Sequence, residues 1–207
     1  MSHKYKVIGF RFRGLGEIAR LILEYSNTPY ENLRLEKEEW ESMKPNVLFH
    51  QLPILEVDGK QLHQSCAIGR YLAKQFNLAG RDDFEAAQVD GVADFQKEVW
   101  TALTPYLSVA FGYSEGDLKA LEASCLVPTL PNYMPLYEQI LKESGSGFFV
   151  ASGVTWVDFY VSEFFLNLQN YAPNVIGEYK FVAEYLERVH NLPQIKEYIK
   201  NRPKTSH

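Results

Sequence analysis

The chain has 207 residues, which is enough for one or two domains with hydrophobic cores. Hydrophobic residues make up 46% and charged residues 23%, the composition of an ordinary globular protein. The net charge is −5 and the Lys and Arg residues are scattered, so a nucleic-acid partner is not expected. No apolar run approaches the roughly 20 residues of a membrane span, so a membrane partner is not expected either.

The N-terminus lacks the apolar stretch of a signal peptide. Cys66 and Cys125 are the only cysteines, and they make neither a disulfide framework nor a metal cluster. We therefore expect a cytoplasmic protein without a bound metal.

The first part of the chain alternates strands and helices. Apolar periodicity predicts, in chain order, a strand at Tyr5–Phe10, a helix at Glu17–Tyr25, a strand at Asn32–Glu36, a short helix at Glu38–Met43, strands at Pro53–Val57 and Lys60–His63, and a helix from Ser65 to Phe76. Asp58-Gly59 is a hairpin signal, so the last two strands should be antiparallel. The order is β-α-β followed by β-β-α.

The stretch Gly14–Ala19 matches the G-x-G-x-x-G/A dinucleotide fingerprint, and Glu36 lies at a suitable distance for the ribose-binding acid. A doubly wound nucleotide fold would continue with parallel strands, whereas this chain turns back in a hairpin. Glu17 also lies in the first turn of the helix, where a pyrophosphate would meet its carboxylate. A nucleotide cofactor is therefore not expected.

Strand signals end after a linker at residues 77–83. Helical patterns then cover, in order, Phe84 to about Tyr113, a segment capped by Ser114–Asp117 that runs to about Glu143 with a break at Pro128 and Pro131, Phe159–Leu168, Tyr179–Val189 and Leu192–Ile199. Thr155 to Asp158 has the spacing of a capping box. We predict an α/β domain at residues 1–80 and an all-α helical domain at residues 84–207.

Two short motifs in the first domain are candidates for ligand binding. Gln51-Leu52-Pro53 precedes a strand; it is either an ordinary loop or, with a cis bond, a place where the Leu52 backbone pairs with an extended peptide. Gln64-Ser65 opens a helix, where Ser65 is suited to be the N-cap. Ser65 is either a cap alone or, with the helix dipole and Gln64, part of a carboxylate site.

Trp40 and Lys44 form a third candidate, because an i, i+4 pair lies on one face of a helix. Indole N–H and ammonium groups are both donors and together suit a second carboxylate. The alternative is a surface aromatic beside a solvated lysine.

Taken in order, these motifs resemble the glutathione transferases over nearly the whole chain, most closely the sigma class of nematode type, related to prostaglandin D synthase. The resemblance rests on Arg13-Gly14-x-Gly16-Glu17-x-x-Arg20, Trp40-x-x-x-Lys44, Gln51-Leu52-Pro53-Ile54-Leu55, Gln64-Ser65-x-Ala67-Ile68-x-Arg70-Tyr71-Leu72, Gly153–Asp158 and Tyr198–Pro203. It implies a thioredoxin-like domain that binds glutathione, followed by a helical domain that lines an apolar substrate site.

The resemblance also implies roles for residues of the glutathione site: Trp40 and Lys44 for the glycyl carboxylate, the Leu52 backbone before a cis Pro53 for the cysteinyl unit, Gln64 and Ser65 for the γ-glutamyl carboxylate, and Gln51 for a further polar contact. Family members are dimers in which an acid of the partner's long helix approaches the γ-glutamyl amine, and Glu98 matches that position. Lys97 interrupts the metal-activating acidic cluster of the prostaglandin synthases, so no metal effect is expected.

The chain departs from the family pattern at Gly9, which occupies the position of the catalytic tyrosine. That tyrosine donates a hydrogen bond to the glutathione sulfur and favours the thiolate, which is the nucleophile. No Ser, Thr, Cys or Tyr lies between Gly9 and Gly16 to replace it. Arg11 is a candidate substitute if the strand continues, because Gly9 and Arg11 then point the same way. The alternative is that Arg11 extends into solvent.

The resemblance implies an apolar substrate pocket, for which the candidates are Phe12, Leu15, Trp100, Leu103 and the region 111–113. Each of them is equally well explained as a core residue. The expected function is conjugation of glutathione to electrophilic small molecules in detoxification, or peroxide reduction, with weakened thiolate activation. A non-catalytic paralogue that binds glutathione or apolar ligands is the alternative, and redox chemistry at Cys66 is a third.

Overall fold

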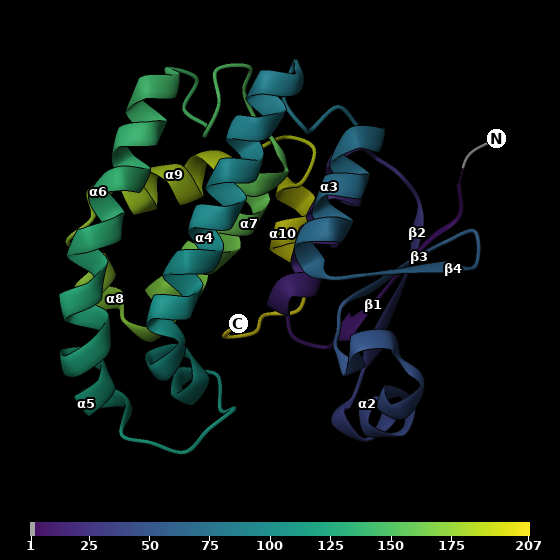
Figure 1. Cartoon of the computed structure of the whole chain (residues 1–207), viewed down its shortest axis with the longest axis horizontal. Helices are drawn as coiled ribbons and strands as arrows, with labels where there is room; N and C mark the ends of the chain where they lie inside the picture. Colours follow the sequence, from purple (N-terminus) through teal and green to yellow (C-terminus); the bar gives the residue numbers. More distant parts are fainter. Residues whose placement is uncertain (1–2) are drawn as a thin grey trace. The chain divides into compact units, whose positions relative to one another are not determined.

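The computed structural model describes residues 3–207, which form two compact units. The first unit combines Met1–Ala79 with Val189–His207, and the second is Gly80–Arg188 (Figure 1). The sequence predicted that Val189–His207 is part of the helical domain. The contacts instead group it with the α/β domain, so the C-terminal segment belongs to the unit that contains the candidate glutathione residues.

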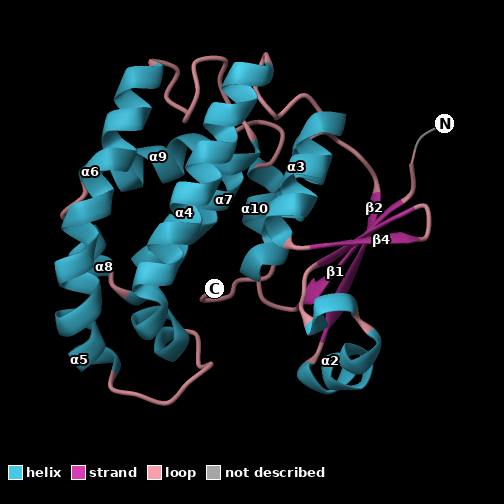
Figure 2. Ribbon diagram, in the orientation of Figure 1, coloured by secondary structure: helices cyan, strands magenta, loops and turns pink. Residues whose placement is uncertain are grey.

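The first unit is built on a four-stranded mixed sheet with the order β2-β1-β3-β4. Its strands are drawn in magenta in Figure 2. Its strands are β1 (Tyr5–Phe10), β2 (Tyr30–Leu35), β3 (Ile54–Val57) and β4 (Lys60–His63). β1 pairs in parallel with β2 and antiparallel with β3, which pairs antiparallel with β4. The predicted β-α-β, β-β-α order is therefore confirmed.

Helices of the first unit cover both faces of this sheet. They are α1 (Glu17–Tyr25), α2 (Lys37–Met43), α3 (Ser65–Gln75) and α10 (Lys196–Asn201), with short 3-10 turns at Gly14–Gly16, Lys44–Asn46 and Leu48–His50. Ile8 packs in a buried cluster with Trp40 of α2, whereas a Cβ at the neighbouring Gly9 would meet Arg20 of α1. Because successive strand residues point to opposite faces, α1 and α2 lie on opposite sides of β1.

A buried carboxylate links α1 to the C-terminal segment within the first unit. Glu17 is 0% exposed, and its Oε2 lies 2.8 Å from Arg20 Nη1. Its Oε1 accepts hydrogen bonds from Tyr198 Oη at 2.8 Å and Arg202 Nη1 at 3.0 Å. Burial, and then the Glu17 charge, raise the pKa of Tyr198, so this hydroxyl stays protonated as a donor. The dinucleotide interpretation is excluded, because the residue after the glycines is a buried acid with its own partners.

The second unit is helical throughout its regular elements: α4 (Asp83–Ala110), α5 (Leu118–Leu121), a π-helical turn (Glu122–Leu126), α6 (Val127–Ser144), α7 (Trp156–Tyr171), α8 (Pro173–Ile176) and α9 (Lys180–His190). The expected break at Pro128 and Pro131 is wrong: Pro128 lies in the first turn of α6, where proline is tolerated, and α6 continues through Pro131. The irregular segment is instead the π-helical turn that ends at Leu126, just before α6. α8 was not predicted, since four residues are too few to show helical periodicity.

The predicted capping box at the start of α7 is present and fully buried. Asp158 accepts hydrogen bonds from Thr155 N at 2.7 Å, Thr155 Oγ1 at 3.0 Å, Phe149 N at 3.2 Å and Tyr185 Oη at 2.9 Å. Burial raises the pKa of Asp158 to about 6, against the lowering effect of these donors. One side chain therefore joins the start of α7 to the preceding loop and to α9.

Replacing this cap should be unusually costly. Asp158→Ala leaves several buried donors without acceptors, so we expect a loss of about 3–5 kcal/mol in the free energy of unfolding. The exposed cap Asp117, which accepts only from Lys119 N and Ala120 N, is the matched control; Asp117→Ala should cost about 1 kcal/mol. Urea unfolding measures both, and equal losses would contradict the central role of Asp158.

Candidate functional site

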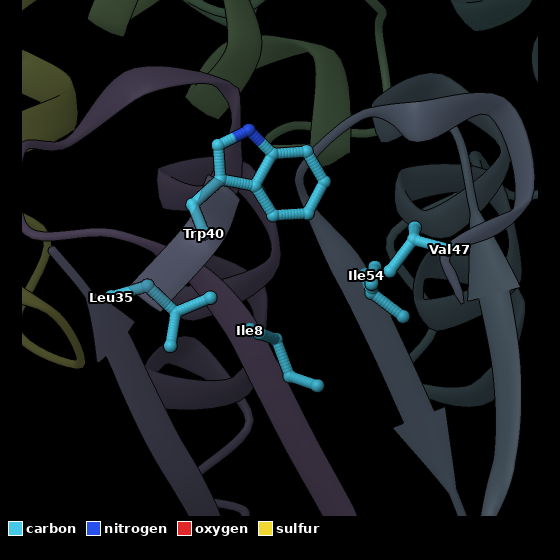
Figure 3. Close-up of a cluster of buried hydrophobic side chains, with 5 residues drawn as sticks. All are labelled: Ile8, Leu35, Trp40, Val47 and Ile54. Atoms are coloured by element: carbon cyan, nitrogen blue, oxygen red, sulfur yellow. The ribbon is translucent and has the colours of Figure 1, made fainter. Parts of the chain in front are cut away.

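Trp40 and Lys44 lie at the end of α2, one helical turn apart. The Lys44 N–H donates to Trp40 O and closes the helix, which confirms that the two residues share a face. The indole is only 6% exposed and packs against Ile8, Leu35 and Ile54, while its nitrogen lies on the side of the ring away from Ile8 and Leu35 (Figure 3). The alternative of a surface aromatic is therefore wrong. The core thus holds the ring and leaves its N–H on the outer side, while Lys44, one turn along the helix, is half-buried.

Gln51 and Gln64 come together although they lie in different segments. Gln64 Nε2 donates to Gln51 Oε1 at 3.1 Å, and both side chains are exposed. Gln64 has φ 72° and is the N-cap of α3, so Ser65 is the first helical residue rather than the cap expected from the sequence. This left-handed conformation is uncommon for a residue with a side chain. The site thus presents two amides and a hydroxyl at the start of a helix.

The Leu52–Pro53 peptide bond is cis. The antiparallel pairing of β3 with β1 ends at Ile54 opposite Ile8, so Leu52 lies outside this ladder. Leu52 also packs against the cluster that contains Trp40. The three candidate motifs for glutathione are consequently all neighbours in one unit: Gln51 contacts Gln64, and Leu52 packs near Trp40.

The structure places a cation where a side chain at position 9 would begin. A Cβ at Gly9 would lie 2.8 Å from Arg20 Nη2, closer than such contacts allow. Arg20 is 0% exposed, and it donates to Asn32 Oδ1, Arg13 O and Glu17 Oε2. The missing Cβ of Gly9 therefore makes room for a buried guanidinium.

Arg11 does not continue β1, which ends at Phe10. Its side chain is 68% exposed, and Arg11 Nε lies 2.6 Å from Oε1 of Glu36, the N-cap of α2. The alternation that would align Arg11 with Gly9 therefore stops one residue too early.

The candidates for the apolar pocket and the dimer contact differ in exposure. In the first unit, Phe12 and Leu15 are half-buried. In the second unit, half-buried Trp100 packs on Phe111 and Phe164, whereas Leu103 is 0% exposed and lies in the core. Glu98 is exposed on α4. Burial and then a hydrogen bond to Glu98 raise the pKa of Tyr133.

Sequence reasoning did not place the C-terminal residues at this site. Arg13 N donates to His207 O at 3.0 Å, and Arg13 Nη2 donates to Ser206 O at 3.1 Å. The His207 ring packs on the Phe12 ring with centroids 4.7 Å apart. Burial, and then the charge of Arg13, lower the pKa of His207. No local pattern predicts this contact, because Phe12 and His207 lie near opposite ends of the chain.

Comparison with known proteins identifies the family. The model of the glutathione S-transferase N-terminal domain matches residues 4–74, and that of the C-terminal domain matches residues 102–202. Glutathione S-transferase 1 of Ascaris suum is 41% identical over 202 residues, which cover 98% of each chain. The chain belongs to the glutathione S-transferase family.

Solved structures agree with this assignment. A glutathione S-transferase of the hookworm Necator americanus that is described as monomeric superposes with a TM-score of 0.92 at 37% identity, covering 99% of this transferase and 100% of that chain. Prostaglandin synthase D of Nilaparvata lugens superposes with a TM-score of 0.86 at 32% identity, covering 98% of this chain and 100% of that chain. The family uses glutathione as a co-substrate.

Two further findings concern residues 3–207 of this transferase. Within that range, no group of three or more His, Cys, Asp or Glu side chains is arranged to hold a metal ion. None of the helices described there is long and apolar enough to cross a membrane.

The close approach of Arg20 to Gly9 predicts that a side chain at position 9 lowers the stability of this transferase. Gly9→Ala forces Arg20 Nη2 away from β1, so we expect a loss of about 1–3 kcal/mol in the free energy of unfolding. Gly91 of α4 is the control because a Cβ there meets nothing within 4 Å. Gly91→Ala should leave stability unchanged or raise it by up to about 1 kcal/mol. Thermal or urea unfolding measures the free energy of unfolding of both variants. An unchanged stability of Gly9→Ala would contradict a tight contact between position 9 and Arg20.

Proposed function

We propose that this transferase is a cytoplasmic, sigma-class enzyme that conjugates reduced glutathione to electrophilic apolar small molecules, or reduces peroxides with it, and that its thiolate activation is weakened by Gly9. The observation that carries the proposal is the meeting of the glutathione motifs in one unit. The hydrogen bond from Gln64 to Gln51 joins two of them, and Leu52 packs near the third, Trp40.

The assigned roles follow the chemistry of each group. Trp40 and Lys44 take the glycyl carboxylate, because an indole N–H and an ammonium are both donors. Gln64 and Ser65 take the γ-glutamyl carboxylate at the positive end of α3, and Gln51 is a further polar contact. The Leu52 backbone pairs with the cysteinyl unit in the manner of an added strand, outside the β1–β3 ladder.

Weakened activation follows from the missing donor at position 9. A free thiol with a pKa of about 8.5 is only a few per cent thiolate at neutral pH. Losing one oriented donor to a developing anion costs about 10² to 10³ in rate. Binding and orientation of the two substrates still contribute, so conjugation is reduced rather than abolished. Phe12 and Leu15 are the apolar contacts that we propose the first unit offers the electrophile.

Binding of glutathione tests the site directly. Lys44→Ala and Gln64→Ala should each raise the Kd measured by calorimetry about tenfold, because each removes a hydrogen bond to a charged carboxylate. Lys74→Ala is the matched control: Lys74 is an exposed lysine in the last turn of α3, and its removal should leave the Kd unchanged.

Conjugation is measured on the same samples with a chloronitroaromatic electrophile. A rate above the uncatalysed reaction supports the enzyme. Glutathione binding without any such rate supports the alternative, a non-catalytic paralogue that binds glutathione or apolar ligands. No binding at all would overturn the glutathione site.

We also propose a homodimer, in which Glu98 of one subunit approaches the γ-glutamyl amine bound by the other. The support is an exposed apolar pair after α2. Leu48 is 62% exposed and Phe49 is 56% exposed. Phe49 has φ 65° and His50 has φ 50°, so two consecutive residues adopt a left-handed conformation that presents the pair. Two large apolar side chains side by side on a surface favour a protein contact.

The oligomeric state is tested by sedimentation. Phe49→Glu places a charge in the proposed contact, so we expect it to convert a dimer into a monomer at micromolar concentration. Tyr113→Glu is the control because Tyr113 is a comparably exposed aromatic residue, 65% exposed, outside this pair. A wild-type protein that sediments as a monomer, as described for the hookworm relative, would contradict the homodimer.

A further inference from the structure

A surface pocket of about 330 Å³ lies in the first unit, where α1 ends and the chain turns into β2. A volume of this size falls within the range of small-molecule sites. Six residues of one short segment line the pocket: Leu23, Glu24, Asn27, Thr28, Pro29 and Tyr30. None of these six belongs to the motifs proposed to bind glutathione, so the pocket is distinct from that site.

Glu24 brings to the pocket a carboxylate that is only half used. The residue is half-buried, and its Oε1 accepts a hydrogen bond from Tyr30 Oη at 2.9 Å. Within residues 3–207, the second carboxylate oxygen of Glu24 has neither a hydrogen-bond donor nor an ion-pair partner. Tyr30 therefore holds the side chain in place, and the remaining oxygen is available to a ligand.

The end of α1 adds negative charge to the pocket. The last carbonyl groups of a helix carry the negative end of its dipole, which basic side chains in the last turn offset. The last turn of α1 contains no basic residue. Backbone N–H groups of residues 26–28 donate to three of these carbonyls, but they bring no net charge. A positively charged group would therefore complement this end of the helix.

The charges that act on Tyr30 do not reverse this sign. Burial, and then the charge of Glu24, raise the pKa of Tyr30, so its hydroxyl stays protonated and continues to donate to the carboxylate. Arg20 acts on Tyr30 in the opposite direction. Arg20 is 0% exposed, however, and Glu17 at 2.8 Å compensates its charge. Glu24 and the end of α1 consequently make the pocket negative.

The polar groups around the carboxylate favour a ligand that donates hydrogen bonds. Asn27 is exposed, and its side-chain amide makes no hydrogen bond within residues 3–207, so its carbonyl oxygen can accept one. The Thr28 hydroxyl is already paired with Ser26 Oγ at 2.9 Å. The volume is about ten times the roughly 30 Å³ that a water molecule occupies, so the pocket has room for an organic group beside the charge.

We propose that this pocket binds a small primary ammonium compound, with its charged group on Glu24 and its carbon chain beside Pro29. An ammonium group has three donors and no acceptor, so it can bind the available oxygen of Glu24 and the side-chain oxygen of Asn27 together. An ion pair at a surface is weak, and we therefore expect a Kd in the millimolar range. This site goes beyond the proposed function and does not depend on it.

The charge requirement is tested by NMR titration of the full chain with three ligands of similar shape: butylammonium, 1-butanol and butanoate. Butylammonium should give saturable shifts of the amide signals of Asn27, Thr28 and Tyr30, whereas the neutral and the anionic ligand should not. The salt concentration is held constant because exposed ion pairs are screened. Equal binding of 1-butanol, or no saturable shift with butylammonium, would overturn the inference. No glutathione is present, so either result leaves the proposed function untouched.

Variants then test the assigned groups. Glu24→Gln keeps an acceptor for Tyr30 Oη but removes the charge, so the Kd for butylammonium should rise about tenfold. Tyr30→Phe keeps the carboxylate, and its Kd should not rise. The control is Glu197→Gln, which removes the same charge from an exposed acid of α10 outside the pocket and should leave the Kd unchanged.

The same spectra show whether each variant is folded. A Kd for butylammonium that is equal in Glu24→Gln and wild type overturns the inference. Loss of binding in Tyr30→Phe also overturns it, because the ligand would then depend on the phenol rather than on the carboxylate. The Kd for glutathione of Glu24→Gln should equal that of wild type, since Glu24 lies outside the glutathione motifs.

Discussion

The buried carboxylate of Glu17 joins segments of the first unit that are far apart in the sequence. It binds Arg20 within α1 and accepts hydrogen bonds from Tyr198 and Arg202 of the C-terminal segment. A fully buried charge is tolerated only with such partners, and breaking one contact would leave uncompensated charge inside the unit. The start of α1, and the C-terminal segment that returns to it, consequently depend on this one group.

The same ion-pair network explains why glycine occupies position 9. Glu17 and Arg13 O fix the guanidinium of Arg20, whose Nη2 fills the space where a Cβ would start. A larger residue at position 9 would have to displace a cation held by a buried acid. The packing around Arg20 therefore favours glycine at this position.

Local patterns predicted much of the fold and nominated the candidate site. The bounds of β1, α1 and β4 match the predicted ranges, because β1 and α1 have apolar patterns and β4 follows the Asp58-Gly59 turn. The cap of α3 was placed one residue late, at Ser65, because a left-handed Gln64 is not a sequence signal. The π-helical turn before α6 was likewise missed, since it continues the apolar pattern of its neighbours.

The sequence by itself determined the family, the order of elements and the residue types that suit glutathione, because these depend on spacing along the chain. Tertiary structure decided where those residues lie and what they contact. It buried Trp40, paired Gln51 with Gln64, and placed Arg20 against Gly9. It also laid His207 on the turn after β1, since contacts between distant segments depend on packing and buried charge rather than on any local pattern.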